Sequence, residues 1–134
     1  MITNIFYIPA KGEEPVSCTS IKLLVNLGMD NDYHATGGDK QLLIITNKLY
    51  ELLRKDDGLC FKRFKANIVV EDILQDGEYT IGDSVIQVKK HQKKCFEECL
   101  KEDKSNCLMK YEVYDACVIS TGNIKIGDEV IKKS

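Results

Sequence analysis

Hydrophobic residues along this chain recur mostly at every second position or in short continuous runs, and both patterns are typical of β-strands. Residues 2–8 form a first predicted strand, which Pro9 ends. Residues 21–27 alternate between apolar and polar side chains over much of their length and predict a half-buried strand. The continuous apolar run at residues 42–45 is short enough for a buried strand. This part of the chain therefore indicates a mainly β protein.

Helical spacing is found only briefly in this pattern. Thr46 is a suitable N-cap for a helix that extends to Arg54, in which three leucines share one face. A further helical turn is expected at residues 95–101. The other apolar segments are rich in β-branched residues and predict four more strands, at residues 64–70, 84–89, 113–119 and 129–132. Many short strands with few helices favour a β-barrel or a folded-over sheet, because closure removes exposed strand edges.

Turns that contain glycine separate several of these strands. The motif Ile-Gly-Asp occurs at residues 81–83 and again at 126–128, and each time β-branched residues follow it. We interpret the repeat as shared turn chemistry rather than as a duplicated site. The Thr-Gly-Asn sequence at residues 121–123 suits a hairpin turn between two strands. Residues 30–40 form a long loop-like stretch, and long loops often carry function.

The length and composition are those of one globular domain, which we expect to span residues 1–134. Hydrophobic residues make up 43% of the chain and charged residues 30%, and the formal net charge of -2 gives no overall attraction to nucleic acid or acidic lipid. No apolar run approaches the ~20 residues that cross a bilayer. The first residues lack the basic region and cleavage site of a secretory signal. We therefore expect a cytoplasmic protein with neither a nucleic-acid nor a membrane partner.

Six cysteines are unusual for a chain with no recognisable signal sequence. In a reducing cytosol most thiols stay free, so we expect metal binding, redox work or plain burial rather than disulfides. Cys95 follows the run KKHQKK at residues 89–94, and nearby positive charge favours the reactive thiolate. Such a thiolate could carry a persulfide, attack an electrophile or bind a soft metal. The alternative is a solvated lysine run beside an ordinary cysteine.

Cys95 also belongs to a group of candidate soft-metal ligands, together with His91, Cys99 and Cys107. Helical spacing would place Cys95 and Cys99 on one face, which suits shared coordination. The spacings nevertheless differ from the paired knuckles of structural zinc sites. A disulfide between Cys99 and Cys107 is disfavoured in a reducing compartment. A zinc site closed by Cys95, Cys99 and Cys107 is therefore a second hypothesis for this segment.

Two further groups are candidates for ligand binding or proton transfer. His34 has three aspartates nearby and could move a proton or orient a ligand, although a polar surface loop explains the same residues. Arg63 lies in the sequence FKRFK at residues 61–65, and its planar fork suits phosphate or another oxyanion. The phenylalanines of that sequence can equally point into the core. No Gly-rich nucleotide loop, Ser-His-Asp constellation or paired-carboxylate hydrolase site is recognisable.

Four segments, in order, resemble the MOSC family, the domain found at the C-terminus of molybdenum-cofactor sulfurases. They are similar to its glycine-x-glycine-aspartate-x-histidine loop, its arginine-glutamine-valine strand, its arginine-phenylalanine-x-x-asparagine-isoleucine segment and its cysteine region. The segments are GMDNDYHA at residues 28–35, GDKQLLI at 38–44, RFKANIVV at 63–70, and the stretch from IGD at 81–83 through Cys95 to IKIGDEV at 124–130. The arrangement of Lys94, Cys95, Cys99 and Cys107 further resembles a bacterial subgroup of short, stand-alone MOSC proteins.

The resemblance implies a MOSC-type β-barrel, like that of pyruvate kinase, with a few short peripheral helices. It also implies a protein associated with the molybdenum cofactor, which carries or transfers sulfur, or binds the molybdenum-pterin group, through Cys95. In relatives the matching cysteine is thought to hold a persulfide or to ligate molybdenum. The residues that the resemblance places on the cofactor side are Arg63, Asn67, His34, Asp32, Lys94 and Lys40.

This chain departs from the family pattern at several positions. Asn31 replaces a glycine, Lys40 an arginine and Phe96 a histidine. Lysine cannot make the bidentate hydrogen bonds of an arginine, which weakens the expected binding of the cofactor. A non-catalytic module that binds the cofactor or a biosynthetic enzyme is therefore an alternative. No lysine is recognisable as a pyridoxal phosphate site, so desulfurase chemistry would come from a partner, a molybdenum-cofactor biosynthetic or sulfur-donor protein.

Overall fold

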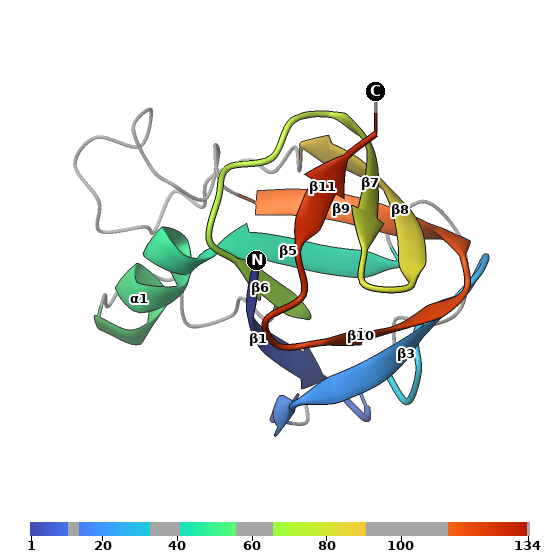
Figure 1. Ribbon diagram of the computed structural model, residues 1–134. Coiled ribbons are helices and arrows are strands. Elements are labelled where there is room, and N and C mark those ends of the chain that lie inside the picture. Colours follow the sequence, from blue (N-terminus) through green and yellow to red (C-terminus); the bar gives the residue numbers. More distant parts are fainter. Residues whose placement is uncertain (11–13, 33–40, 56–65, 91–112, 134) are drawn as a thin grey trace.

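The structure is a computed structural model that describes residues 1–10, 14–32, 41–55, 66–90 and 113–133. Within these residues the chain forms eleven strands and one short helix (Figure 1). In chain order they are β1 (Ile2–Tyr7), β2 (Val16–Cys18), β3 (Ser20–Leu24), β4 (Gly28–Met29), β5 (Leu42–Thr46), α1 (Asn47–Lys55), β6 (Ile68–Val70), β7 (Gly77–Ile81), β8 (Ser84–Lys90), β9 (Val113–Ser120), β10 (Gly122–Lys125) and β11 (Val130–Lys132).

Most of the strands belong to one curled sheet of eight strands, in the order β11-β7-β8-β9-β5-β6-β1-β2. Its neighbouring strands are antiparallel except β5 and β6, which are parallel because the chain returns through α1 between them. A smaller sheet, β10-β3-β4, lies along the lower side of the curl in Figure 1. The mainly β, barrel-like architecture that the strand pattern predicted is confirmed.

Backbone hydrogen bonds link the first strand of the chain to the turn between its last two strands. The N–H of Ile2 donates to the carbonyl of Asp128, and the N–H of Gly127 donates to the carbonyl of Ile2, both at 2.9 Å. The same turn is held to the smaller sheet, since the N–H of Ile126 donates to the carbonyl of Thr19 at 2.9 Å. The start of the barrel and its C-terminal strands are therefore joined directly.

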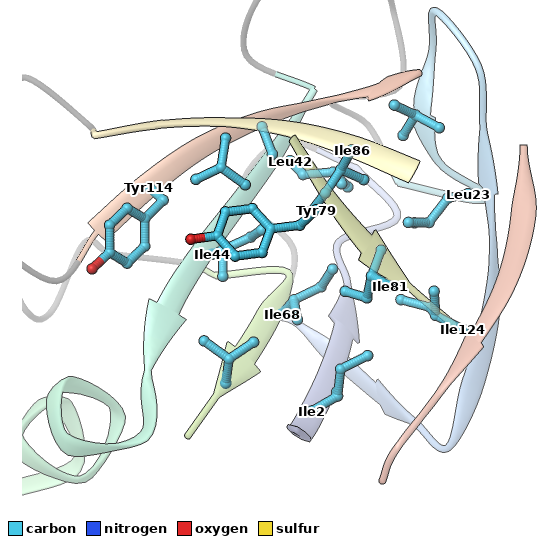
Figure 2. Close-up of a cluster of buried hydrophobic side chains, with 14 of the residues drawn as sticks. Ile2, Leu23, Leu42, Ile44, Ile68, Tyr79, Ile81, Ile86, Tyr114 and Ile124 are labelled. Carbon is cyan, nitrogen blue, oxygen red and sulfur yellow. The ribbon is translucent and has the colours of Figure 1, made fainter. Parts of the chain in front are cut away.

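The interior of the barrel is almost entirely aliphatic. Alternate residues of β7, β8 and β9 are buried, as expected where one face of a sheet covers a core. Figure 2 shows these side chains meeting from strands that are far apart in the sequence. The labelled members of this core are Ile2, Leu23, Leu42, Ile44, Ile68, Tyr79, Ile81, Ile86, Tyr114 and Ile124.

The helix α1 packs on the outside of the barrel, against the other face of β5 and β6 (Figure 1). Its Leu49 lies in a second, smaller apolar cluster with Ile45, Ala66, Val69 and Val113. The predicted N-cap is confirmed, because the N–H of Leu49 donates to the Thr46 hydroxyl at 3.2 Å.

Two strand boundaries differ from the sequence-based prediction. The strand expected at residues 21–27 ends at Leu24, where the N–H of Leu27 donates to the Leu24 carbonyl and closes a turn. Asn26 has a φ of 63° in this turn, a left-handed conformation that asparagine tolerates better than most residues. Of the strand expected at residues 64–70, the structure shows β6, which begins only at Ile68. The short strands β2, β4 and β10 and the strand β7 were not predicted.

The hairpin predicted at residues 121–123 is wrong. β9 and β10 follow each other in the chain, but β10 pairs with β3 in the smaller sheet and not with β9. Gly122 is required for close packing rather than for a hairpin, because a Cβ atom there would lie 2.3 Å from the carbonyl oxygen of Asp83. Thr121 thus marks the place where the chain passes from one sheet to the other.

Candidate functional site

Asn67 occupies the position just before β6 and is fully buried. Its side-chain Oδ1 accepts the N–H of Leu43 at 3.0 Å, while its own N–H donates to the Leu43 carbonyl at 2.8 Å. On the other side, the N–H of Phe6 donates to the Asn67 carbonyl at 2.7 Å, and Asn67 Nδ2 donates to the Phe6 carbonyl at 3.3 Å. Asn67 therefore bridges β1 and β5 just before β6 begins between them.

Asp32 lies against this asparagine. Its Oδ1 accepts a hydrogen bond from Asn67 Nδ2 at 3.0 Å and another from the N–H of Ile8 at 2.7 Å. The side chain is only 6% exposed, so these donors replace the water that a carboxylate would otherwise bind. The structure thus brings together Asp32 and Asn67, which are 35 residues apart in the sequence.

The loop that delivers Asp32 turns sharply after β4. The N–H of Asp32 donates to the carbonyl of Met29 at 3.2 Å, which closes a turn. Asn31 has a φ of 65° within it. The left-handed region favours glycine and, after glycine, asparagine. The asparagine found where the MOSC pattern has glycine is therefore compatible with the same turn.

Three chain segments that contain most of the candidate site residues join the described structure close to this pair. Segment 33–40 follows Asp32, and segment 56–65 leads into Ala66 and Asn67. Segment 91–112 begins after Lys90 and ends before Val113. Val113 and Ala66 belong to the same small apolar cluster, and Lys90 is paired with Tyr114 across β8 and β9. At least one described end of each segment therefore lies around β5, β6 and β9.

The other predicted site residues lie outside the described residues. They are His34, Lys40, Arg63, Lys94, Cys95, Cys99 and Cys107. In the described part of the chain, no three histidine, cysteine or acidic side chains are grouped as metal ligands would be.

Two described cysteines provide a reference for thiol behaviour. Cys18 and Cys117 are both free thiols and half-buried. Burial raises the pKa of the Cys18 thiol above its ordinary value of 9.0, since the thiolate loses solvation there. Cys18 therefore has a raised pKa, whereas an activated cysteine has a lowered one.

A surface hollow of about 420 Å³ lies elsewhere, where the two Ile-Gly-Asp turns meet. Asp83 and Asp128 both line it, together with Asn123, Glu129 and Ile131. It is found at the Ser84 end of β8, whereas segment 91–112 leaves from the Lys90 end, roughly 20 Å away at the rise of an extended strand. Of the predicted site residues that the structure describes, neither Asp32 nor Asn67 lines it. Both Ile-Gly-Asp sequences form turns with glycine at positive φ, Gly82 in the hairpin between β7 and β8 and Gly127 in the connection between β10 and β11.

Sequence reasoning missed the backbone partners of the buried pair. The N–H groups of Ile8 and Leu43 belong to strands or strand ends that give no polar signal in the sequence. Met29, whose Sδ lies 3.8 Å from Asn67 Nδ2, has none either. Apart from the resemblance to the MOSC pattern, the sequence offered only a polar asparagine directly before a β-branched run.

Comparison with solved structures finds the same fold. The structure of YiiM from Escherichia coli, a MOSC-domain protein, matches over 99% of this chain and 69% of that chain, with a TM-score of 0.60 and 16% sequence identity. The fold is MOSC-like. The crystal structure of a hypothetical protein matches over 100% of this chain and 68% of that chain, with a TM-score of 0.64 and 16% identity. No family model and no curated protein matches the sequence.

Among the described residues, no helix is both long enough and apolar enough to span a bilayer.

Proposed function

We propose that this protein takes part in molybdenum-cofactor metabolism and carries sulfur on Cys95. The observation that supports the proposal most is that segments 33–40, 56–65 and 91–112 each join the MOSC-like barrel in the same region. Asp32 and Asn67 are hydrogen-bonded, and Ala66 and Val113 share one apolar cluster. The segments with His34, Arg63 and Cys95 thus depart from or return to one region of the fold, as a shared site requires.

The proposed chemistry is a transfer of sulfane sulfur. The Cys95 thiolate attacks the outer sulfur of a persulfide on a donor protein, and the donor cysteine leaves as a thiolate. The bond between the two donor sulfurs breaks, a new sulfur–sulfur bond forms on Cys95, and no external oxidant or reductant is needed. Lys93, Lys94 and Arg63 would supply the positive charge that keeps Cys95 ionised.

Asp32 and Asn67 have a positioning part in this proposal. The Asn67 side chain is fully buried, and its donors and acceptor are directed at protein atoms of β1, β5 and Asp32. Asp32 likewise accepts from Ile8 and Asn67. These contacts suit residues that hold the ends of segments 33–40 and 56–65 rather than residues that bind the pterin directly.

A molybdenum cofactor at this place would supply an acceptor for the carried sulfur. The residues that would hold it are Arg63 and Lys40 for the pterin phosphate and Cys95 for molybdenum, and His34 could move a proton or orient the ligand. Guanidinium and ammonium groups suit a phosphate, and a thiolate suits a soft metal centre. The residue types in these segments therefore fit the group.

The direct test is sulfur loading of the purified protein. The protein is incubated with a cysteine desulfurase and cysteine, alkylated, and digested for mass spectrometry. We expect an extra sulfur atom on the peptide that contains Cys95, and none in the Cys95→Ser variant. The Cys117→Ser variant is the matched control, because it also removes one free thiol. Cys117 is half-buried and lies on β9, outside segment 91–112.

The same preparation separates the other hypotheses. Sulfur on several cysteines at equal yield, or loading that persists in Cys95→Ser, would contradict the proposal. Near-stoichiometric zinc that is lost in Cys95→Ser, Cys99→Ser and Cys107→Ser variants would favour the structural metal site instead. Pterin binding that survives loss of the thiol would favour the non-catalytic binding module.

A further inference from the structure

One long edge of β11 has no partner strand within the part of the chain that the structure describes. On its other edge β11 pairs with β7 along its whole length, and just beyond it the N–H of Lys133 donates to the carbonyl of Glu78 at 2.9 Å. In an antiparallel pair only every second residue exchanges hydrogen bonds with the opposite strand. Ile131 and Lys133 therefore bond to β7, whereas the backbone N–H and C=O groups of Val130 and Lys132 are directed toward the free edge.

The side chains around this edge are accessible. Ile131 is 59% exposed, and Glu129, Lys132 and Lys133 are exposed as well. β11 lies at the front of the view in Figure 1. A row of unpaired backbone groups beside an exposed apolar side chain is a template for another strand. Lysines on an edge strand can also prevent such pairing by repulsion, so the charge pattern decides between the two outcomes.

The charge pattern of β11 is complementary to itself. In a two-fold antiparallel arrangement centred on Ile131, Val130 of each copy lies opposite Lys132 of the other. These are the residues whose backbone groups face the free edge, so each such pair can exchange both of its hydrogen bonds. The same register places Glu129 of each copy opposite Lys133 of the other. Opposite charges on directly opposite residues stabilise a strand pair, and like charges destabilise it.

The neighbouring registers are less favourable. A two-fold axis at Val130 would place Lys132 opposite Asp128, whose backbone groups are already used. The N–H of Asp128 donates to the carbonyl of Lys125 at 3.1 Å, and its own carbonyl accepts the N–H of Ile2 at 2.9 Å. A two-fold axis at Lys132 would place that lysine opposite its own copy, which like charge disfavours. The register centred on Ile131 therefore uses open backbone groups and opposes no like charges.

We propose that the free edge of β11 binds a second copy of this chain, so that two barrels join through antiparallel β11 strands centred on Ile131. The arrangement is isologous and closes as a dimer rather than continuing as a filament. Glu129 and Ile131 also line the surface hollow, so Lys133 of the second copy would stand opposite a carboxylate of that hollow. A single short strand pair buries little surface, which places the dimer among weak interfaces. The proposal is independent of sulfur transfer.

The experiment is analytical ultracentrifugation from micromolar to millimolar protein, with charge reversal at the two ends of the strand pair. Glu129→Lys and Lys133→Glu each place like charges opposite one another at both ends. We expect either variant to raise the dissociation constant of the dimer about tenfold or more. An equimolar mixture of the two variants restores opposite charges at both ends, so it should form a heterodimer about as tight as the unmodified dimer.

Matched controls carry the same charge changes away from β11. They are Glu14→Lys, just before β2, and Lys22→Glu on β3, both at exposed positions. Lys133 also lies 3.9 Å from the Glu78 carboxylate, but both side chains are half exposed and such a pair contributes little to stability. Thermal unfolding of each variant checks that the monomer is folded, and the control variants should dimerise as the unmodified protein does.

Amide hydrogen exchange followed by NMR provides a readout of the pairing itself. Exchange at Val130 and Lys132 should slow as the protein concentration rises, while exchange at Ile131, whose N–H is bonded to β7, should not change. A protein that stays monomeric at all concentrations would overturn the proposal. So would a dimer that both charge reversals leave intact, or two variants that do not recombine when mixed. Open-ended assemblies would overturn it too, in favour of pairing between β11 and β2 at the opposite edge of the sheet.

Discussion

Replacing Asn67 by alanine is the most informative single perturbation of this fold. The substitution removes one acceptor and two side-chain N–H groups from a site with no access to water. The N–H of Leu43 loses its partner, and the Asp32 carboxylate loses one of its donors. The Phe6 carbonyl loses its contact with Asn67 Nδ2.

The expected loss of stability follows from these groups. Leaving a buried neutral N–H without a partner costs about 1–3 kcal/mol, and a hydrogen bond to a charged group contributes about 1.5–3 kcal/mol. Because the two losses share one small site, they do not simply add, and we expect the free energy of unfolding to fall by about 3–5 kcal/mol. For a domain of this size that corresponds to a fall in Tm of about 10–20 °C.

The assay is denaturant unfolding followed by circular dichroism, with Asn123→Ala as the control. Asn123 is an exposed asparagine on β10, so its loss is expected to change stability by less than about 0.5 kcal/mol. A double-mutant cycle with Asp32→Ala isolates the bond between the two side chains, and we expect a coupling energy of about 1–2 kcal/mol.

Two results would refute this reasoning. A loss below about 1 kcal/mol in Asn67→Ala would mean that water or a neighbouring group replaces the lost partners. Strict additivity of Asn67→Ala and Asp32→Ala would mean that the 3.0 Å contact between them contributes nothing to stability.

Three further predictions concern separate features of the structure. Gly28→Ala should lower the thermal unfolding midpoint more than Gly127→Ala. Both glycines have positive φ, but of the two only Gly28 has another residue within contact distance of an added Cβ. Equal losses in the two variants would contradict the close packing at Gly28. Thr46→Ala should lower the free energy of unfolding by about 1 kcal/mol through loss of the N-cap of α1, and Thr46→Ser should restore most of it if the hydroxyl is responsible. For Cys18 the raised pKa means that the folded state favours the neutral thiol, so its contribution to stability is present below pH 9.0 and is lost as the pH rises toward the higher folded-state pKa. A stability profile measured from pH 8 to pH 11 should therefore fall less steeply in Cys18→Ala, and identical profiles would contradict the assignment.

The local sequence was sufficient for the elements that depend on local chemistry. The apolar run Leu42–Ile45 is a buried strand, and Thr46 caps the helix that follows it. Both Ile-Gly-Asp motifs are turns before a strand, with Gly82 and Gly127 at positive φ. Such features depend on residues within a few positions of one another, which is the range over which periodicity and capping act.

Two features that the sequence did not predict depend on partners outside their own stretch of the chain, whereas β7, also missed, pairs with the strand that directly follows it. β2 is three residues long and exists because residues 5–7 of β1 pair with it. The corner at Thr121 was mistaken for a hairpin because glycine and asparagine suit both a turn and a close backbone approach. Here the approach is to Asp83, which is distant in the sequence. No local pattern distinguishes the two uses of the same residues.

The candidate site divides in the same way. The resemblance to the MOSC pattern selected Asp32 and Asn67 as members of one site, and the spacing of apolar residues indicated a mainly β barrel. Only the tertiary structure decided that these two side chains bond to each other inside the protein, and that the Gln41 side chain accepts a hydrogen bond from β9. The physical reason is that a buried polar group is defined by its partners, and those partners are backbone groups of strands whose arrangement the chain adopts only when the barrel closes.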